Sequence, residues 1–173
     1  MSFITQYFER LDAAGRARFA DLSTDTERLI NTKYTSGMTS IFMAILLSIL
    51  YMPVFCALFV YWVPPEYRGS VWWIYMIYAS VWVGAIQGGA IGSILGWGMG
   101  LYWQGKRHKA GMFCLIGGAI ALFLMGLLQA LFYEGSAMPL AEFTYWAFLY
   151  FSPAYLAAAG VTVWGLGLLC TGE

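Results

Sequence analysis

Few side chains in this chain could carry out chemistry, and those few lie far apart. The single histidine, His108, lies in a basic stretch from Gly105 to Ala110, and three cysteines lie in separate apolar runs with no C-x-x-C spacing. Zinc and haem sites need several His or Cys ligands at suitable spacings. The sequence therefore predicts no metal ion and no cofactor. The thiols are expected to act as buried, small hydrophobic groups; they belong to Cys56, Cys114 and Cys170.

Motifs of known enzyme classes are also missing from the sequence. It contains no G-x-S-x-G, no H-E-x-x-H and no glycine-rich phosphate loop between a strand and a helix. Proton and cation pathways in membranes generally use ionisable side chains inside the apolar segments. The four apolar segments of this chain contain no Asp, Glu, Lys, Arg or His. We therefore predict that the protein is not an enzyme, and the same absence weakens the case for ion-coupled transport.

Four apolar segments must position the remaining side chains. Hydrophobic residues make up 61% of the 173 residues, charged residues only 10%, and the mean hydropathy is +0.68. A helix of about 20 such residues crosses the core of a bilayer. The sequence predicts an all-α integral membrane protein with an N-terminal segment, residues 1–37, and a four-helix transmembrane domain, residues 38–173. The expected spans cover residues 38–63, 71–103, 111–133 and 143–170.

Basic residues set the expected orientation of these spans. Five of them precede the first span, three lie between the second and third, and the other two loops contain only Arg68. Because positive charge gathers on the cytoplasmic side of membrane proteins, both termini are expected in the cytoplasm and the protein in the bacterial inner membrane. Glu134 and Glu142 then flank an outer loop, where solvated charges are the simplest account of them. No basic face suggests nucleic acid binding.

The N-terminal segment has the pattern of an amphipathic helix. Its apolar residues cluster on one face at 100° per residue, with an expected interruption at Ala13–Gly15. Thr24 and Glu27 have the spacing of a capping box, which predicts a second short helix towards Lys33. The first helix could lie on the lipid surface or dock on another protein. The apolar face consists of Ile4, Phe8, Leu11, Phe19 and Leu22.

The second span contains a stripe of glycines. They occur at every fourth position, a spacing typical of a glycine zipper, and we call them the glycine stripe: Gly84, Gly88, Gly92, Gly96 and Gly100. Helices in lipid associate by close van der Waals contact, which small residues allow. Each step of four residues turns the stripe by about 40°, so a straight partner helix cannot follow all of it.

Three uses of the glycine stripe remain open from the sequence. It could pack against another helix of the same chain, it could contact a second copy or a different subunit, or it could line a pore or a groove for lipid. Gln87 lies beside the stripe near mid-span, and Gln129 lies in the third span. An amide inside a membrane needs a hydrogen-bond partner. Direct pairing of these two amides is doubtful, because Gln129 lies nearer the outer side.

These features favour a non-catalytic membrane subunit. We expect the glycine stripe to pack the protein into a homo-oligomer or into a larger membrane complex, such as a secretion or conjugation machine. One alternative is an ion or solute channel formed by several copies. Another is an immunity protein against a bacteriocin, or an exclusion protein. In each case the expected partners are the lipid bilayer, further copies and other membrane subunits.

Overall fold

The computed structural model describes residues 3–62, 65–67, 69–134 and 139–171, and it is all-helical over these ranges. Short polar turns separate long apolar runs, and each run continues as one helix, even through Pro53 and Pro153. The helices are α1 (Phe3–Ala20), α2 (Asp25–Trp62), α3 (Ser70–Trp103), α4 (Arg107–Glu134) and α5 (Leu140–Cys170), with a short 3-10 turn at Pro65–Tyr67.

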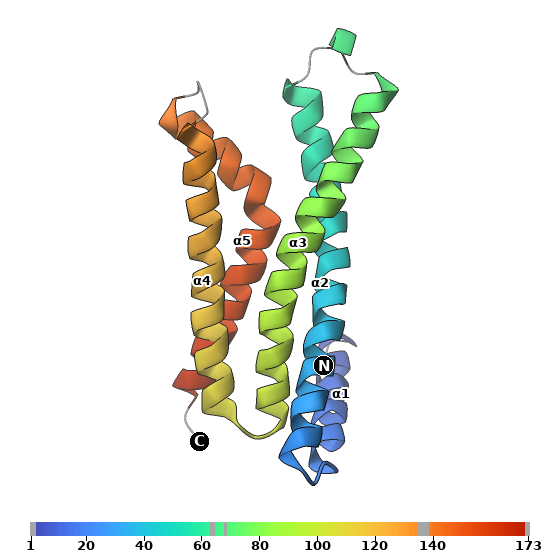
Figure 1. The fold of residues 1–173 in the computed structure, drawn as a ribbon, viewed down its shortest axis with the longest axis vertical. Coiled ribbons are helices and arrows are strands. Elements are labelled where there is room, and N and C mark those ends of the chain that lie inside the picture. Colours follow the sequence, from blue (N-terminus) through green and yellow to red (C-terminus); the bar gives the residue numbers. More distant parts are fainter. Residues whose placement is uncertain (1–2, 63–64, 68, 135–138, 172–173) are drawn as a thin grey trace.

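Two antiparallel helix pairs make up the bundle (Figure 1). α2 and α3 form the more extensive pair, α4 and α5 form the second, and contacts between α3 and α4 join them. α1 lies at one end of the bundle together with the α3–α4 turn and the last turn of α5 (Figure 1). We call this the α1 end. Both chain ends lie towards it.

The two pairs are joined differently at the opposite end. There α3 and α4 diverge (Figure 1), and aromatic rings connect α2 with α5. The ring centroids of Phe55 and Tyr150 are 4.3 Å apart, and those of Tyr61 and Trp146 are 4.8 Å apart. Large aromatic surfaces bury apolar area efficiently, so these contacts hold the pairs together where the helices separate.

α2, α3, α4 and α5 are long and apolar enough to cross a membrane. Each of them also exposes large apolar side chains on its outer face: Phe42 on α2, Ile86 on α3, Phe123 on α4 and Leu156 on α5. A water-soluble bundle places charged and polar residues on that face. The described part of the chain therefore has the surface of a multi-pass membrane protein.

The polar segment before the first span differs from the prediction. The capping box is confirmed: the Thr24 hydroxyl accepts the Glu27 N–H at 3.2 Å, and the Glu27 carboxylate accepts the Thr24 N–H at 3.1 Å. The helix that it opens is not short, because α2 runs without a break from Asp25 to Trp62. No proline interrupts the polar first turns, so they continue into the apolar run.

α1 is continuous through Ala13–Gly15, so the expected interruption there is wrong. A glycine lowers helix propensity by about 1 kcal/mol, a cost that tertiary contact can offset. Here Gly15 is buried beneath the indole of Trp103. The apolar face divides in two: Phe19 is 3% exposed, whereas Ile4, Phe8 and Leu11 are exposed.

The core of the bundle lies where α2, α3, α4 and α5 meet. Tyr51 and Phe55 of α2 and Ile91 of α3 are buried there. The thiols differ in their surroundings, because Cys114 is buried in this core, Cys56 is half-buried and Cys170 is exposed. The prediction of buried thiols is therefore confirmed for Cys114 and wrong for Cys170.

Candidate functional site

The glycine stripe of α3 faces α2 of the same chain. A Cβ atom built on Gly88 would lie 2.8 Å from the Cα of Ala44, and one built on Gly96 would lie 2.7 Å from the Cα of Ser36. Such distances are shorter than real carbon contacts. Only glycine therefore lets the two backbones approach this closely. All five glycines of the stripe are buried against α2.

α2 carries a matching stripe of small residues at the same spacing of four. Its members are Thr32, Ser36, Ser40, Ala44 and Ser48, which lie opposite Gly100, Gly96, Gly92, Gly88 and Gly84 in that order. Each step of four residues along α2 is matched by a step of four back along α3, so the antiparallel register stays constant throughout. Small residues on both helices allow a closer approach than glycine on one alone.

Three serines of α2 also form hydrogen bonds to the α3 backbone. The Ser36 hydroxyl donates to the Ser93 carbonyl at 3.0 Å, the Ser40 hydroxyl to the Gly89 carbonyl at 2.9 Å, and the Ser48 hydroxyl to the Val81 carbonyl at 3.1 Å. These bonds follow the same constant register. Since a polar group in an apolar surrounding is costly when unpaired, the bonds both satisfy the hydroxyls and fix the register of the pair.

One partner helix therefore follows the whole glycine stripe. A contact that repeats every four residues exceeds the 3.6 residues of a helical turn, so the two helices must wrap around each other with a right-handed twist. The sequence left three uses of the glycine stripe open. In the structure the stripe packs against another helix of the same chain, which is the first of them. The stripe is covered by α2 and leaves no room for a second copy at that face.

α4 and α5 form a second seam through glycines. A Cβ on Gly165 would lie 2.5 Å from the backbone nitrogen of Leu115, and one on Gly111 would lie 3.0 Å from the Gly165 carbonyl oxygen. Other glycines in these helices face outwards, with no heavy atom within 4 Å of the Cβ position: Gly126 on α4, and Gly160 and Gly167 on α5. Small residues are thus used inside the bundle and are also present on its outer surface.

The side-chain amides of Gln87 and Gln129, which lie within the expected spans, have separate partners. The buried Tyr51 hydroxyl donates to the Gln87 side-chain oxygen, which ties α2 to α3 near the middle of the bundle. The Gln129 amide donates to the Ala147 carbonyl at 3.3 Å, which ties α4 to α5. Gln87 and Gln129 do not pair with each other. Among the described residues no buried side-chain nitrogen or oxygen lacks a partner.

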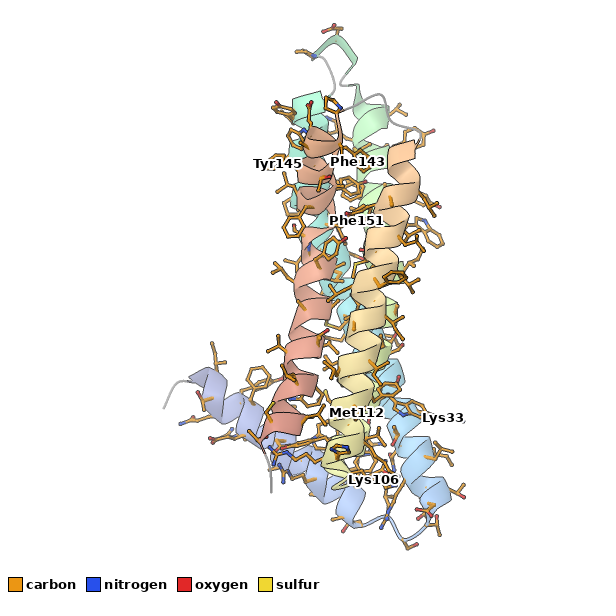
Figure 2. All side chains as sticks on the ribbon, turned by 90° about the vertical axis from the view of Figure 1, so that its left-hand side faces the viewer. Lys33, Lys106, Met112, Phe143, Tyr145 and Phe151 are labelled. Carbon is orange, nitrogen blue, oxygen red and sulfur yellow. The ribbon has the colours of Figure 1, made fainter. Side chains whose placement is uncertain are left out.

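α1 docks on the end of α3 through a small polar network. The Asp12 carboxylate accepts the Trp103 indole N–H at 3.0 Å and the Arg16 Nε–H at 3.0 Å. The Arg16 guanidinium also donates to the Tyr102 hydroxyl. In Figure 2 α1 runs obliquely across the α1 end and its N-terminal half projects beyond the bundle, while Lys33 and Lys106 lie near the same end.

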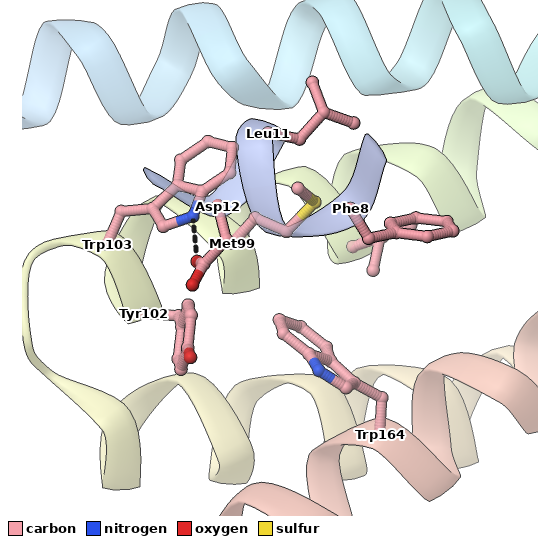
Figure 3. Close-up of a pocket in the computed structure, with 8 residues that line it drawn as sticks. Phe8, Leu11, Asp12, Met99, Tyr102, Trp103 and Trp164 are labelled. Atoms are coloured by element: carbon pink, nitrogen blue, oxygen red, sulfur yellow. Dashed lines mark hydrogen bonds between the residues drawn. The ribbon is translucent and has the colours of Figure 1, made fainter. Parts of the chain in front are cut away.

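Two cavities border this docking point, and Tyr102 and Trp103 line both of them. The first has a volume of about 390 Å³ and is apolar apart from Asp12. Figure 3 shows its lining between α1, α3 and α5, with Phe8 and Leu11 on one side and Trp164 on the other. The second has a volume of about 350 Å³. It is lined by Arg16, Phe19, Ala20, Arg28, Tyr102, Trp103, Gln104 and Gly105.

The sequence interpretation missed the small-residue stripe of α2, the partner role of Tyr51 and both cavities. The stripe was detectable, because its spacing equals that of the glycines. No group of three or more His, Cys, Asp or Glu residues that could hold a metal ion occurs in the described ranges. The side chain of Glu134 lies outside the described residues, and Glu142 is exposed in the first turn of α5.

Comparison with known protein families, curated proteins and solved structures found no match to this chain.

Proposed function

We propose that this protein is a non-catalytic integral membrane subunit that assembles with further copies of itself through the outer face of α5. The observation that carries this proposal is the pair of open glycines on that face. Gly160 and Gly167 are exposed, and no heavy atom lies within 4 Å of either Cβ position. The glycine stripe of α3, by contrast, is filled by α2.

The same face alternates large and small side chains in a way that suits a second copy. Leu156 and Val163 are exposed, and each lies four residues before one of these glycines, Leu156 before Gly160 and Val163 before Gly167. The glycines are seven residues apart, the heptad spacing of helices that cross at about 20°. A leucine or valine of one copy can fit over a glycine of the other, so the surface is complementary to itself, as a two-fold interface requires.

The orientation in the membrane follows from the charges. The basic residues of α1, of the first turns of α2 and of the start of α4 all belong to the α1 end. By the positive-inside rule this end faces the cytoplasm. The lipid bilayer is then the surrounding of the exposed apolar side chains. Spans without ionisable Asp, Glu, Lys, Arg or His support a role in assembly rather than catalysis.

Cysteine cross-linking in native membranes tests this assembly. In a variant whose Cys56, Cys114 and Cys170 are replaced by alanine, Val163→Cys should form a disulfide-linked dimer on mild oxidation. The matched control is Phe123→Cys, which places a thiol on the exposed face of α4. We expect at least about tenfold more dimer from Val163→Cys. Equal dimer yields, or none from either variant, would contradict the proposed α5 interface.

A further inference from the structure

We propose that the two cavities beside α1 together form a binding site for one anionic phospholipid, with its phosphodiester in the arginine-lined cavity and an acyl chain in the apolar cavity. We call them the arginine cavity and the apolar cavity. The proposal rests on the membrane insertion proposed above, which extraction of membranes with alkaline carbonate tests separately. It does not depend on the α5 interface.

The arginine cavity has the groups that recognise a phosphate. The side chains of Arg16, Arg28 and Gln104 line it from α1, α2 and the end of α3. Two nitrogens of Arg28 donate to the Leu22 carbonyl, at 3.3 and 3.2 Å. Since a guanidinium has five N–H groups in a planar fork, Arg28 keeps donors for a second acceptor. That geometry suits the paired oxygens of a phosphate.

The local charge favours a monoanion. Asp12 lies 3.0 Å from Arg16 and balances much of its charge, whereas the partner of Arg28 is a neutral carbonyl. No acidic side chain of the described residues lines the arginine cavity. The C-terminal end of α3 contributes about half a negative charge, which is smaller than the full charge of Arg28. A phosphodiester, with one negative charge, matches the net positive charge that remains in the arginine cavity.

Two backbone carbonyls at the end of α3 do not compete for the N–H groups of Arg16 and Arg28. The Gln104 N–H donates to the Gly100 carbonyl at 3.2 Å, and the Gly105 N–H donates to the Tyr102 carbonyl at 2.9 Å. Gly105 closes this turn with a φ of 76°, a conformation that favours glycine. The Gly100 and Tyr102 carbonyls therefore already have backbone donors.

The apolar cavity lies deeper along the same helix. Its lining reaches back to Leu95 and Met99 on α3, and Leu95 lies nine residues before Gln104. At 1.5 Å per residue this is about 13 Å nearer the middle of the bundle. Charged groups at the end of a span and apolar groups below them repeat the order of headgroup and acyl chain in a lipid leaflet. Basic pockets between transmembrane helices bind anionic headgroups on the cytoplasmic side.

Native mass spectrometry of the detergent-purified full chain tests the site. The protein is mixed with equal amounts of phosphatidylglycerol and phosphatidylcholine that have the same acyl chains, and the lipids retained are counted. Both lipids carry the phosphodiester, but phosphatidylcholine adds a quaternary ammonium that cancels its charge and is repelled by the positive charge of Arg28. We therefore expect phosphatidylglycerol to be retained about tenfold more. Equal retention of the two lipids overturns the proposal.

Variants locate the binding. Arg16→Gln combined with Arg28→Gln should abolish the preference, and Arg10→Gln should keep it. Arg10 is exposed on the same helix, carries the same charge and lines neither cavity. A preference that survives the double substitution places the lipid elsewhere and overturns the proposal.

A cavity-filling variant and a competition experiment complete the test of the lipid site. If the double variant does not fold, Ala20→Phe fills the arginine cavity without changing its charge and should also abolish the preference; full retention overturns the proposal. Inorganic phosphate and glycerol 3-phosphate distinguish a lipid from a free phosphate. We expect neither to displace phosphatidylglycerol at millimolar concentration, because neither fills the apolar cavity. Displacement by either one would assign the site to a soluble phosphate and overturn the lipid assignment.

Discussion

Replacement of Gly92 by alanine tests how the α2–α3 pair is held together. The added Cβ would lie 2.5 Å from the Thr39 carbonyl oxygen and 2.8 Å from the Ser40 Cα. Both are backbone atoms and cannot turn aside as a flexible side chain would. Ordinary carbon contacts lie at about 3.5–4.0 Å. The helices must therefore move apart by roughly 0.7–1 Å at this point.

That displacement has a cost that can be worked out from the contacts. The Ser40–Gly89 hydrogen bond, now 2.9 Å, would lengthen beyond hydrogen-bonding range. A membrane side-chain hydrogen bond contributes about 0.6 kcal/mol, and overpacking a tight contact costs about 1–3 kcal/mol. Alanine regains up to about 1 kcal/mol through its higher helix propensity. The net loss in free energy of unfolding is about 0.6–2.6 kcal/mol.

The assay is unfolding in mixed micelles by titration with SDS, followed by tryptophan fluorescence. The matched control is Gly126→Ala on α4, because no heavy atom lies within 4 Å of that Cβ position. It should be as stable as the unmodified protein or slightly more stable. If Gly92→Ala and Gly126→Ala unfold at the same SDS fraction, the glycine stripe does not set the distance between α2 and α3, and the reasoning above is refuted.

Three further predictions use the same titration or a simple digestion. A double-mutant cycle of Tyr51→Phe and Gln87→Leu should give a coupling energy of about 0.6–1.7 kcal/mol, since their hydrogen bond lies inside the bundle; additive effects would mean that the bond contributes nothing. Gly105→Ala should lower the free energy of unfolding by about 1–2 kcal/mol, because φ is 76° there; an unchanged stability would contradict the strain argument. Trp103→Phe removes the indole N–H that holds α1, so trypsin should cleave after Arg18 severalfold faster; an unchanged cleavage rate would show that this bond does not hold α1 in place.

The elements of the fold could be predicted from the sequence where local signals decide them. The second span was expected at residues 71–103, and α3 runs from Ser70 to Trp103, because a long apolar run between polar turns leaves few alternatives. The capping box at Thr24 depends on residues three apart and was also correct. Features that depend on contacts between distant segments were not predicted, such as the continuity of α1 beneath Trp103.

The partner of the glycine stripe was missed for a physical reason. The matching stripe on α2 begins at Thr32 and Ser36, before the apolar run that starts at Met38. A boundary set by hydropathy therefore divides this stripe, and its hydroxyl residues count as polar although they pack tightly in the α2–α3 contact. Small size and a hydrogen bond back to a carbonyl make serine suitable for such a contact. Spacing of small residues, counted across the boundary, would have shown the match.

The mass of the particles extracted gently from their own membrane tests the proposed assembly most directly. Native mass spectrometry should show the unmodified protein at a multiple of 19.3 kDa. Gly160→Leu, which fills the open face of α5, should reduce the particles to a single chain of about that mass and leave the fold intact. Unmodified protein found only as a single chain, or an oligomer that persists in Gly160→Leu, would contradict assembly through α5.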